Sequence, residues 1–178
     1  AGQSVNFTTL LLNRKDRDAE LEVIQDMADR IQAIKRSVSI RANGEGLGIA
    51  FGFSRKAWDY LFPNAPVPKE LEDFQVIKGD KQDVPAVAAD LFLHVRSNNE
   101  SVTYTVVDQI MEFLRPVTSV VDETHGFHYE QGRAIIDFVD GTENPVGQEA
   151  VEWGVIGDED PEFTNGSYAF AQKYEHDL

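Results

Sequence analysis

Two long segments with helical apolar periodicity, separated by short β-prone stretches, constrain the fold of this chain most strongly. In the first, apolar residues recur at three- and four-residue spacing from Leu21 to Ile34, which predicts one buried face of a long helix. The second covers residues 101–115 and turns its apolar residues inward in the same way. The β-prone stretches precede, separate and follow these helices, at residues 5–12, 47–53, 91–95, 117–121 and 127–129.

This order predicts an α+β fold of the ferredoxin-like type, β-α-β-β-α-β, with an antiparallel sheet and its helices on one face. Ser54 can cap a short helix that carries Trp58 and that Pro63 ends. Residues 63–89 contain several prolines and scattered charges, so we expect a long irregular connection there.

The run from Ile136 to Pro145, IDFVDGTENP, is the most informative part of the chain for function. We expect Phe138 and Val139 to be buried at the end of a strand, so that Asp140 lies where an apolar interior meets a glycine-containing loop. An acid in such a place is costly to ionise unless a partner stabilises it, and acids with perturbed pKa values cluster at functional sites. The alternative is an ordinary turn in which Asp140 caps its own backbone.

The full run closely resembles the signature loop of the dye-decolourising peroxidases, haem enzymes that reduce hydrogen peroxide. Their motif is Gly-x-x-Asp-Gly followed by Thr-x-Asn-Pro, and here Asp137 stands where the first glycine belongs. Segments at 90–96, 126–129, 159–163 and 166–178 are also similar to the family, in the same order. The resemblance therefore covers nearly the whole chain from residue 5 onward. The loop residues that match the motif are Asp140, Gly141, Thr142, Asn144 and Pro145.

Members of this family are built from two ferredoxin-like halves, which together make a dimeric α+β barrel-like fold. The resemblance implies that residues 1–146 form the first ferredoxin-like domain with the distal haem loop. It also implies that residues 147–178 form the crossover and the first strand of a second such domain. The alternation of small, aromatic and polar residues at 167–174 favours that strand. Because a strand without partners exposes an edge, we expect the chain to be a piece of a longer protein.

The resemblance implies that Asp140 is the acid–base catalyst that moves a proton between the two oxygens of peroxide on haem b. A carboxylate performs this task best at acidic pH. Gly141 would let the backbone approach the flat ligand closely. For Thr142 and Asn144 the alternative is that they cap their own turn, and we expect Asp137 to be structural. The residues that the resemblance places beside the haem are Gly141, Thr142, Glu143 and Asn144.

Haem iron also needs an axial ligand, commonly a histidine. We expect His94 to be half-buried in a strand rather than a ligand, and His125 and His128 to lie in a β segment where their spacing does not suit a metal. His176 is near the end of the chain but does not match the family pattern. The resemblance implies that the proximal histidine and the distal arginine belong to the second half. We therefore expect this piece alone neither to bind haem tightly nor to turn over.

Composition limits the partners of the chain. A formal charge of −15 argues against nucleic acid and against an anionic membrane surface. No apolar run approaches the roughly 20 residues needed to cross a bilayer. The absence of cysteine excludes disulfides and thiolate ligation of iron, and fits a cytoplasmic protein. The first residues lack the basic and apolar regions of a secretory signal.

The resemblance implies hydrogen peroxide and an aromatic reductant as substrates and a homo-oligomeric protein. Some members are packaged into a protein shell through a C-terminal tail, which this chain does not include. One alternative is a non-catalytic ferredoxin-like ligand-binding or assembly module, whose apolar surface would favour self-association. Another is a relative that releases iron from haem or oxidises porphyrins. Trp58, Tyr104 and Trp153 could relay electrons to a substrate, although we expect them to pack in the core or in turns.

Overall fold

The computed structural model describes residues 2–139 and 141–177 of the chain. The chain divides into two compact units. The first unit contains Ala1–Pro63 and Glu72–Phe127, and the second contains Asn64–Leu71 and His128–Leu178.

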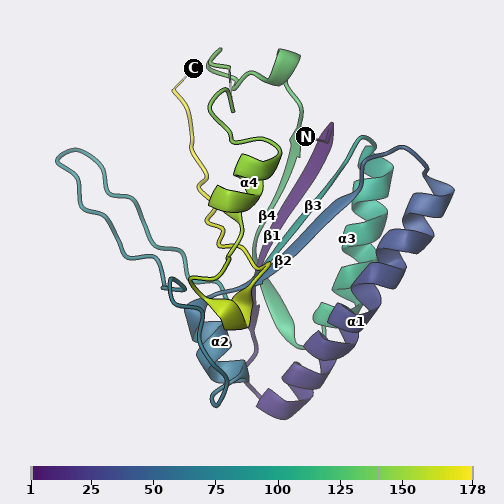
Figure 1. Ribbon diagram of the computed structural model, residues 1–178, viewed down its shortest axis with the longest axis vertical. Coiled ribbons are helices and arrows are strands. Elements are labelled where there is room, and N and C mark those ends of the chain that lie inside the picture. Colours follow the sequence, from purple (N-terminus) through teal and green to yellow (C-terminus); the bar gives the residue numbers. More distant parts are fainter. Residues whose placement is uncertain (1, 140, 178) are drawn as a thin grey trace. The chain divides into compact units, whose positions relative to one another are not determined.

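The first unit is a four-stranded sheet with two long helices and one short helix (Figure 1). All neighbouring strands run antiparallel, and their order across the sheet is β2-β3-β1-β4. This order and the alternation of strands and helices confirm the predicted ferredoxin-like fold. The elements are β1 (Ser4–Leu12), α1 (Arg17–Arg41), β2 (Gly48–Phe53), α2 (Arg55–Leu61), β3 (Leu91–Ser97), α3 (Glu100–Leu114) and β4 (Thr118–Phe127).

The helices begin at capping side chains that the sequence supplies. The carboxylate of Asp16 accepts a hydrogen bond from the backbone N–H of Ala19 at 3.1 Å and starts α1. The hydroxyl of Ser54 accepts one from Ala57 at 3.2 Å, which confirms the predicted start of α2. Helix α1 continues to Arg41, beyond the apolar stripe that the sequence showed up to Ile34.

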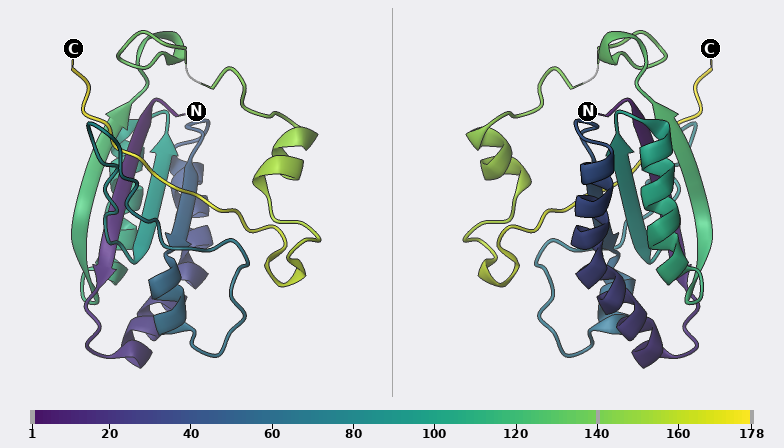
Figure 2. Two further views of the ribbon diagram at one scale, coloured as in Figure 1. Left: turned by 90° about the vertical axis from the view of Figure 1, so that its left-hand side faces the viewer. Right: turned by 90° about the vertical axis from the view of Figure 1, so that its right-hand side faces the viewer.

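The core of the first unit lies between one face of the sheet and the helices α1 and α3, which cover that face in both views of Figure 2. Along β1 every second residue is buried, as the period of a strand requires when one face is covered. The largest fully buried apolar side chains are Leu10, Ile24, Met27, Leu61, Leu91, Leu93, Val95, Val106, Ile110 and Leu114.

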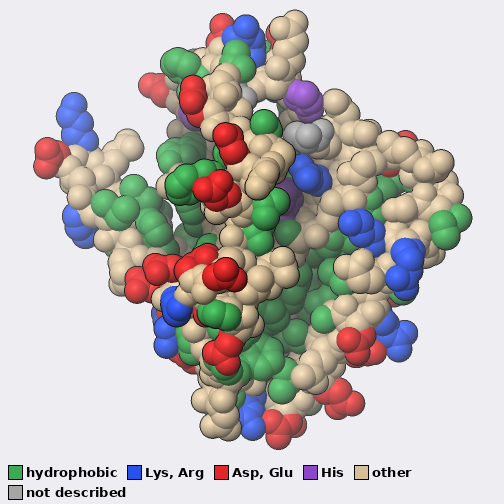
Figure 3. All heavy atoms as spheres, in the orientation of Figure 1, with side chains coloured by type: hydrophobic (Ala, Val, Ile, Leu, Met, Phe, Trp, Pro, Cys, Tyr) green, Lys and Arg blue, Asp and Glu red, His purple; other side chains and the backbone are tan. Residues whose placement is uncertain are grey.

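The solvent side of α1 carries charged side chains of both signs, visible on the right of Figure 3. Among them Arg30 donates to Asp26, one helical turn earlier, at 2.9 Å. Within residues 2–139 and 141–177, no helix is long and apolar enough to cross a membrane.

The opposite face of the sheet carries aromatic side chains. His94 of β3 stacks on Phe7 of β1, with ring centroids 4.4 Å apart and planes inclined by 7°. Phe92 lies beside them, 5.9 Å from Phe7 between ring centroids. His94 is half-buried, as expected, and this burial, together with the positive charge of Arg96, lowers its pKa below the ordinary value.

The connection between α2 and β3 is long and irregular, as predicted. Within it Ile77 and Val84 exchange backbone hydrogen bonds of 3.1 and 2.9 Å and form a short hairpin, which extends on the left of Figure 1. An earlier part of this connection, Asn64–Leu71, belongs to the second unit. There the backbone N–H of Lys69 donates to the buried carboxylate of Asp160 at 2.9 Å.

The second unit contains one short helix, α4 (Gln148–Gly154), and two 3-10 turns, Glu130–Gly132 and Pro161–Phe163. Residues 166–177 have neither helical nor strand structure. A strand forms by pairing with a neighbour, so the predicted strand at 167–174 stays a prediction. The predicted domain boundary after residue 146 also stays a prediction. In the first unit the two β-prone stretches at 117–121 and 127–129 belong mostly to one strand, β4, which confirms a further β segment there and shows a register shift against β1 between Thr9 and Leu10. The pairing of β4 with β1 keeps the polar residues between these two stretches extended.

We predict that His94 makes the first unit less stable at acidic pH. Because the pKa of His94 is lower in the folded protein than in the unfolded chain, folding favours its neutral form. This contribution is fully present above the ordinary pKa of about 6.5, and it is lost as pH falls through the lowered pKa. Urea unfolding from about pH 8 to about pH 4 should therefore show a shallower loss of unfolding free energy for His94→Gln than for the wild type.

The matched control is His128→Gln, which removes an exposed histidine of the second unit and should keep the wild-type pH dependence. If His94→Gln lost stability on acidification as steeply as the wild type, His94 would not be the group responsible.

Candidate functional site

A tight hairpin over residues 133–139 leads into the predicted site loop. Arg133 and Val139 form an antiparallel bridge. The N–H of Ala134 donates to the carbonyl of Phe138 at 2.7 Å, and the N–H of Asp137 donates to the carbonyl of Ala134 at 2.8 Å. This bonding pattern belongs to a three-residue hairpin loop, in which the third loop residue takes the left-handed conformation that glycine adopts most easily.

Asp137 is that third loop residue, and its φ is 74°. Glycine adopts this conformation most easily, and aspartate is one of the few other residues that tolerate it. The expectation that Asp137 is structural agrees with this geometry. The predicted strand that ends in Phe138 and Val139 is not formed, because the chain reverses at Asp137 and Val139 makes a single bridge to Arg133.

Phe138 and Val139 are exposed, by 72% and 50% respectively, so the predicted burial of these two residues is wrong. The hairpin is a single bridge wide and offers no sheet face under which its apolar side chains could be buried. The result is an apolar surface directly before the site loop.

The Arg133 side chain bonds to the loop of the hairpin. Its Nη1 donates to the main-chain carbonyl of Asp137 at 2.8 Å, and its guanidinium lies 3.5 Å from the Asp137 carboxylate. The Arg133 side chain is 35% exposed, whereas that of Asp137 is 88% exposed, so the ion pair is largely screened by water. The sequence prediction did not include Arg133. The one available signal was Asp137, since an acid in place of a glycine marks a left-handed turn residue.

Asp140, the predicted catalyst, lies outside the described residues. The next residue, Gly141, has φ 72°, and an added Cβ there would come within 2.7 Å of Nδ2 of Asn144. The N–H of Asn144 donates to the carbonyl of Gly141 at 3.3 Å and closes a tight turn. Thr142 and Glu143 occupy the tip of this turn.

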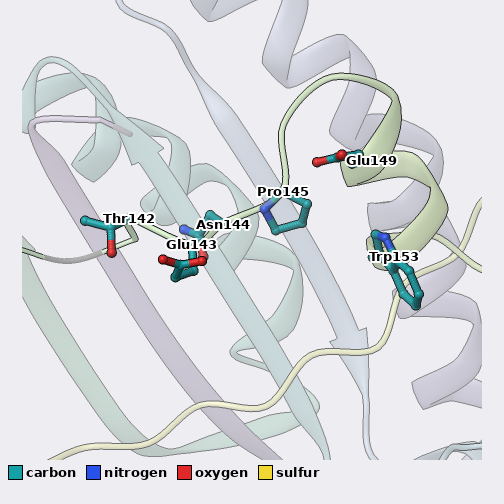
Figure 4. A pocket seen from close by; sticks show the side chains of 6 residues that line it. All are labelled: Thr142, Glu143, Asn144, Pro145, Glu149 and Trp153. Carbon is teal, nitrogen blue, oxygen red and sulfur yellow. The ribbon is translucent and has the colours of Figure 1, made fainter.

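The turn and α4 together line an open pocket in the second unit (Figure 4). Glu149 and Trp153 stand one helical turn apart on α4, across from Pro145. The structure thus places three of the predicted haem-lining residues around one pocket, which offers hydroxyl, amide and carboxylate groups beside an aromatic ring. The pocket is lined by Thr142, Glu143, Asn144, Pro145, Glu149 and Trp153.

The aromatic residues that were expected to pack differ in their surroundings. Trp58 packs against Phe62, with ring centroids 4.9 Å apart, as predicted. Tyr104 and Trp153 are 63% and 77% exposed, so the predicted packing of these two is wrong. Both project from helical surfaces that the described part of the chain leaves open to solvent.

Three of the histidines have partners other than a histidine. In the first unit His94 stacks on Phe7, and His125 lies 2.8 Å from the Glu123 carboxylate. In the second unit His176 stacks on Tyr174 at 6.3 Å between ring centroids. Among the residues that the structure describes, no three His, Asp or Glu side chains are grouped in a way that could hold a metal ion.

Comparison with known proteins finds relatives along the chain. A family profile described as "Dyp-type peroxidase, N-terminal" matches residues 1–128, and one described as "Dyp-type peroxidase, C-terminal" matches residues 131–178. A dye-decolorizing peroxidase of Rhodococcus erythropolis is 38% identical over 157 residues, which are 88% of this chain and 46% of that protein. One of Mycobacterium tuberculosis is 35% identical over 155 residues, with 87% and 46% covered.

Solved structures agree with this result. A dye-decolorizing peroxidase from Bacteroides thetaiotaomicron has a TM-score of 0.85 and 35% identity, and the match covers 92% of this chain and 53% of that one. The encapsulated DyP-type peroxidase from Mycobacterium smegmatis has a TM-score of 0.85 and 32% identity, with 92% and 52% covered. A DypB variant from Rhodococcus jostii RHA1 in complex with heme has a TM-score of 0.85 and 29% identity, with 92% and 52% covered. This chain therefore spans about half the length of the relatives it matches.

We predict that Gly141→Ala destabilises the second unit by about 1–2 kcal/mol, because a Cβ disfavours the left-handed conformation and would crowd Asn144. Urea unfolding followed by circular dichroism measures the loss, and hydrogen exchange of peptides covering residues 141–150 locates it. Gly154→Ala is the matched control, because a Cβ at Gly154 meets no heavy atom within 4 Å. Equal stability of the two variants would contradict the role assigned to Gly141.

Proposed function

Because this chain belongs to the Dyp-type peroxidase family, we propose that it forms the N-terminal part of a haem enzyme that reduces hydrogen peroxide and oxidises an aromatic or porphyrin reductant. The observation that carries the proposal is the match to both family profiles, the second of which covers the 136–145 run, together with the signature residues inside that run. The match to a relative solved in complex with heme supports haem b as the cofactor.

In this proposal Asp140 is the acid–base catalyst. Haem, when bound, supplies the iron that binds peroxide and stores the oxidising equivalents. Asp140 takes a proton from one peroxide oxygen and returns it to the other, so that water can leave. The carboxylate must be ionised to accept the proton, and the working pH of such a group lies near its pKa. We therefore expect an acidic pH optimum.

The residues after Asp140 suit the edge of a haem. The Gly141–Asn144 turn is exposed and carries a hydroxyl group at Thr142 and an amide group at Asn144 for hydrogen bonding to a bound ligand. Phe138 and Val139 add an exposed apolar surface on the N-terminal side of the loop, which suits the apolar face of a porphyrin. We assign Gly141, Thr142, Glu143 and Asn144 to the distal haem pocket.

We further propose that the isolated chain does not retain haem. Two of the described histidines are engaged elsewhere, since His94 stacks on Phe7 and His125 pairs with Glu123. The proximal histidine and distal arginine would then come from the rest of the enzyme. The encapsulated relative from Mycobacterium smegmatis supports an oligomeric, shell-packaged enzyme as the assembled form. The lack of cysteine supports a cytoplasmic location.

A second candidate function, a non-catalytic assembly module, is favoured by one observation. The sheet face that carries Phe7, Phe92 and His94 lies opposite the helices and is apolar enough to pair with another surface. Haem binding by the longer protein that contains this sequence separates the two functions, because an assembly module has no need of the cofactor.

We predict that haemin titrated into the isolated 19.9 kDa chain keeps the broad Soret band of free haemin, without the shift and sharpening of a ligated haem, since no axial ligand holds the iron. Absorbance between about 350 and 450 nm, with the intact mass measured in parallel, checks this, and the longer protein is the positive control. A saturable shift and sharpening of the Soret band with the isolated chain would overturn the proposal on haem retention, and His176→Ala would then test the first candidate ligand.

In the haem-loaded longer protein, we predict that Asp140→Asn slows the reaction with hydrogen peroxide by about 10²- to 10⁴-fold, because the amide cannot accept the proton. Stopped-flow absorbance measures this rate. Asp158→Asn removes an exposed carboxylate elsewhere in the second unit and should leave the rate unchanged. A wild-type rate in Asp140→Asn, or an optimum above neutral pH, would overturn the assignment.

A further inference from the structure

We propose that Arg133 is a positioning residue for the site, which fixes the hairpin from which Asp140 extends. The inference rests on the proposed function, since it assigns Arg133 to the support of the proposed catalyst. It concerns a residue outside the loop motif, whose hydrogen bond and ion pair with Asp137 lie within the second unit.

The first argument is the place of Arg133 in the hairpin. Arg133 pairs with Val139, the residue directly before Asp140. The backbone of Arg133 therefore fixes one end of the hairpin, and its side chain fixes the other end through the 2.8 Å bond to the Asp137 carbonyl. Arg133 thus contacts the hairpin at its bridge and at its loop, and stabilises the residues that directly precede Asp140 in the sequence.

The second argument is the strain at Asp137. At a φ of 74° a residue with a Cβ has a higher conformational free energy than in the right-handed region, whereas glycine adopts this φ at almost no cost. This chain has aspartate where the family motif has glycine, so its hairpin needs a compensating contact. The bond from the Arg133 guanidinium to the Asp137 carbonyl supplies that contact at the strained residue itself.

The third argument identifies which part of Asp137 matters. Its carboxylate is 88% exposed and 3.5 Å from Arg133, so the exposed ion pair contributes little. Its carbonyl accepts the shorter bond from a guanidinium that is only 35% exposed. Arg133 therefore acts on the backbone, and removal of the Asp137 side chain should matter less than removal of the Arg133 side chain.

The test uses the haem-loaded longer protein, in which the wild-type reaction with peroxide and its loss in Asp140→Asn are measured first. Arg133→Leu should slow the reaction with peroxide at least tenfold while the Soret absorbance per protein is retained. It should also move the acidic limb of the pH–rate profile, because the surroundings of Asp140 change. Arg133→Lys should recover part of the rate, since an ammonium group can donate to the carbonyl but lacks the planar fork.

The matched control is Arg55→Leu. Arg55 pairs with an aspartate four residues later, as Arg133 does, but lies in α2 of the first unit, and its loss should leave the rate and the pH profile unchanged. A double variant tests the argument from strain at Asp137. In an Asp137→Gly background, Arg133→Leu should cost clearly less than in the wild type, because glycine removes the strain that the arginine offsets.

The two proposals fail differently. If the wild-type protein does not react with peroxide, or if Asp140→Asn has no effect, the proposed function fails. If Asp140→Asn abolishes the reaction but Arg133→Leu keeps the rate within twofold and the same pH profile, Arg133 is not a positioning residue. A third outcome would also overturn the proposal. In it, the rate of Arg133→Leu and of Arg133→Lys falls only as far as the haem content falls, and the pH profile does not change. Arg133 would then have a role in folding alone.

Discussion

The pairing of β1 with two neighbours holds the first unit together. β1 bonds to β3 along one edge and to β4 along the other, so three of the four strands depend on its register. A slip of one residue would turn Leu10 and Leu12 away from α1 and α3 and place their half-buried neighbours in the core. The alternation of burial along this single strand therefore fixes which face of the sheet the helices cover.

Most of the fold could be predicted from the sequence because its signals are local. The periodicity of α1 and α3 and the capping groups at Asp16 and Ser54 are local signals, and the structure follows them. The length of β4 is set instead by pairing with β1, which keeps the polar stretch between residues 121 and 127 extended. Pairing of this kind depends on a partner distant in the sequence, so the local composition does not predict it.

For the candidate site, the sequence predicted the loop but not the structure that precedes it. The motif identified the loop, and the structure brings Thr142, Glu143 and Asn144 around one pocket. The apolar run before the loop was misleading, because Phe138 and Val139 have strand-like sequence but lie in a hairpin too narrow to bury them. Arg133 could not be found from composition, since its main partner is a backbone carbonyl that any residue would supply.

The backbone, more than side-chain packing, defines the approach to this loop. Left-handed residues stand at Asp137 and Gly141, on either side of the segment that carries the proposed catalyst. Each closes its own short turn, by the Ala134 and Asp137 bond in one case and by the Gly141 and Asn144 bond in the other. Two left-handed residues, each in its own turn, therefore precede and follow this short segment along the chain. It follows that asparagine or glycine at position 137 preserves the approach, whereas a β-branched residue, which the left-handed region disfavours most, disrupts it without touching any reacting group.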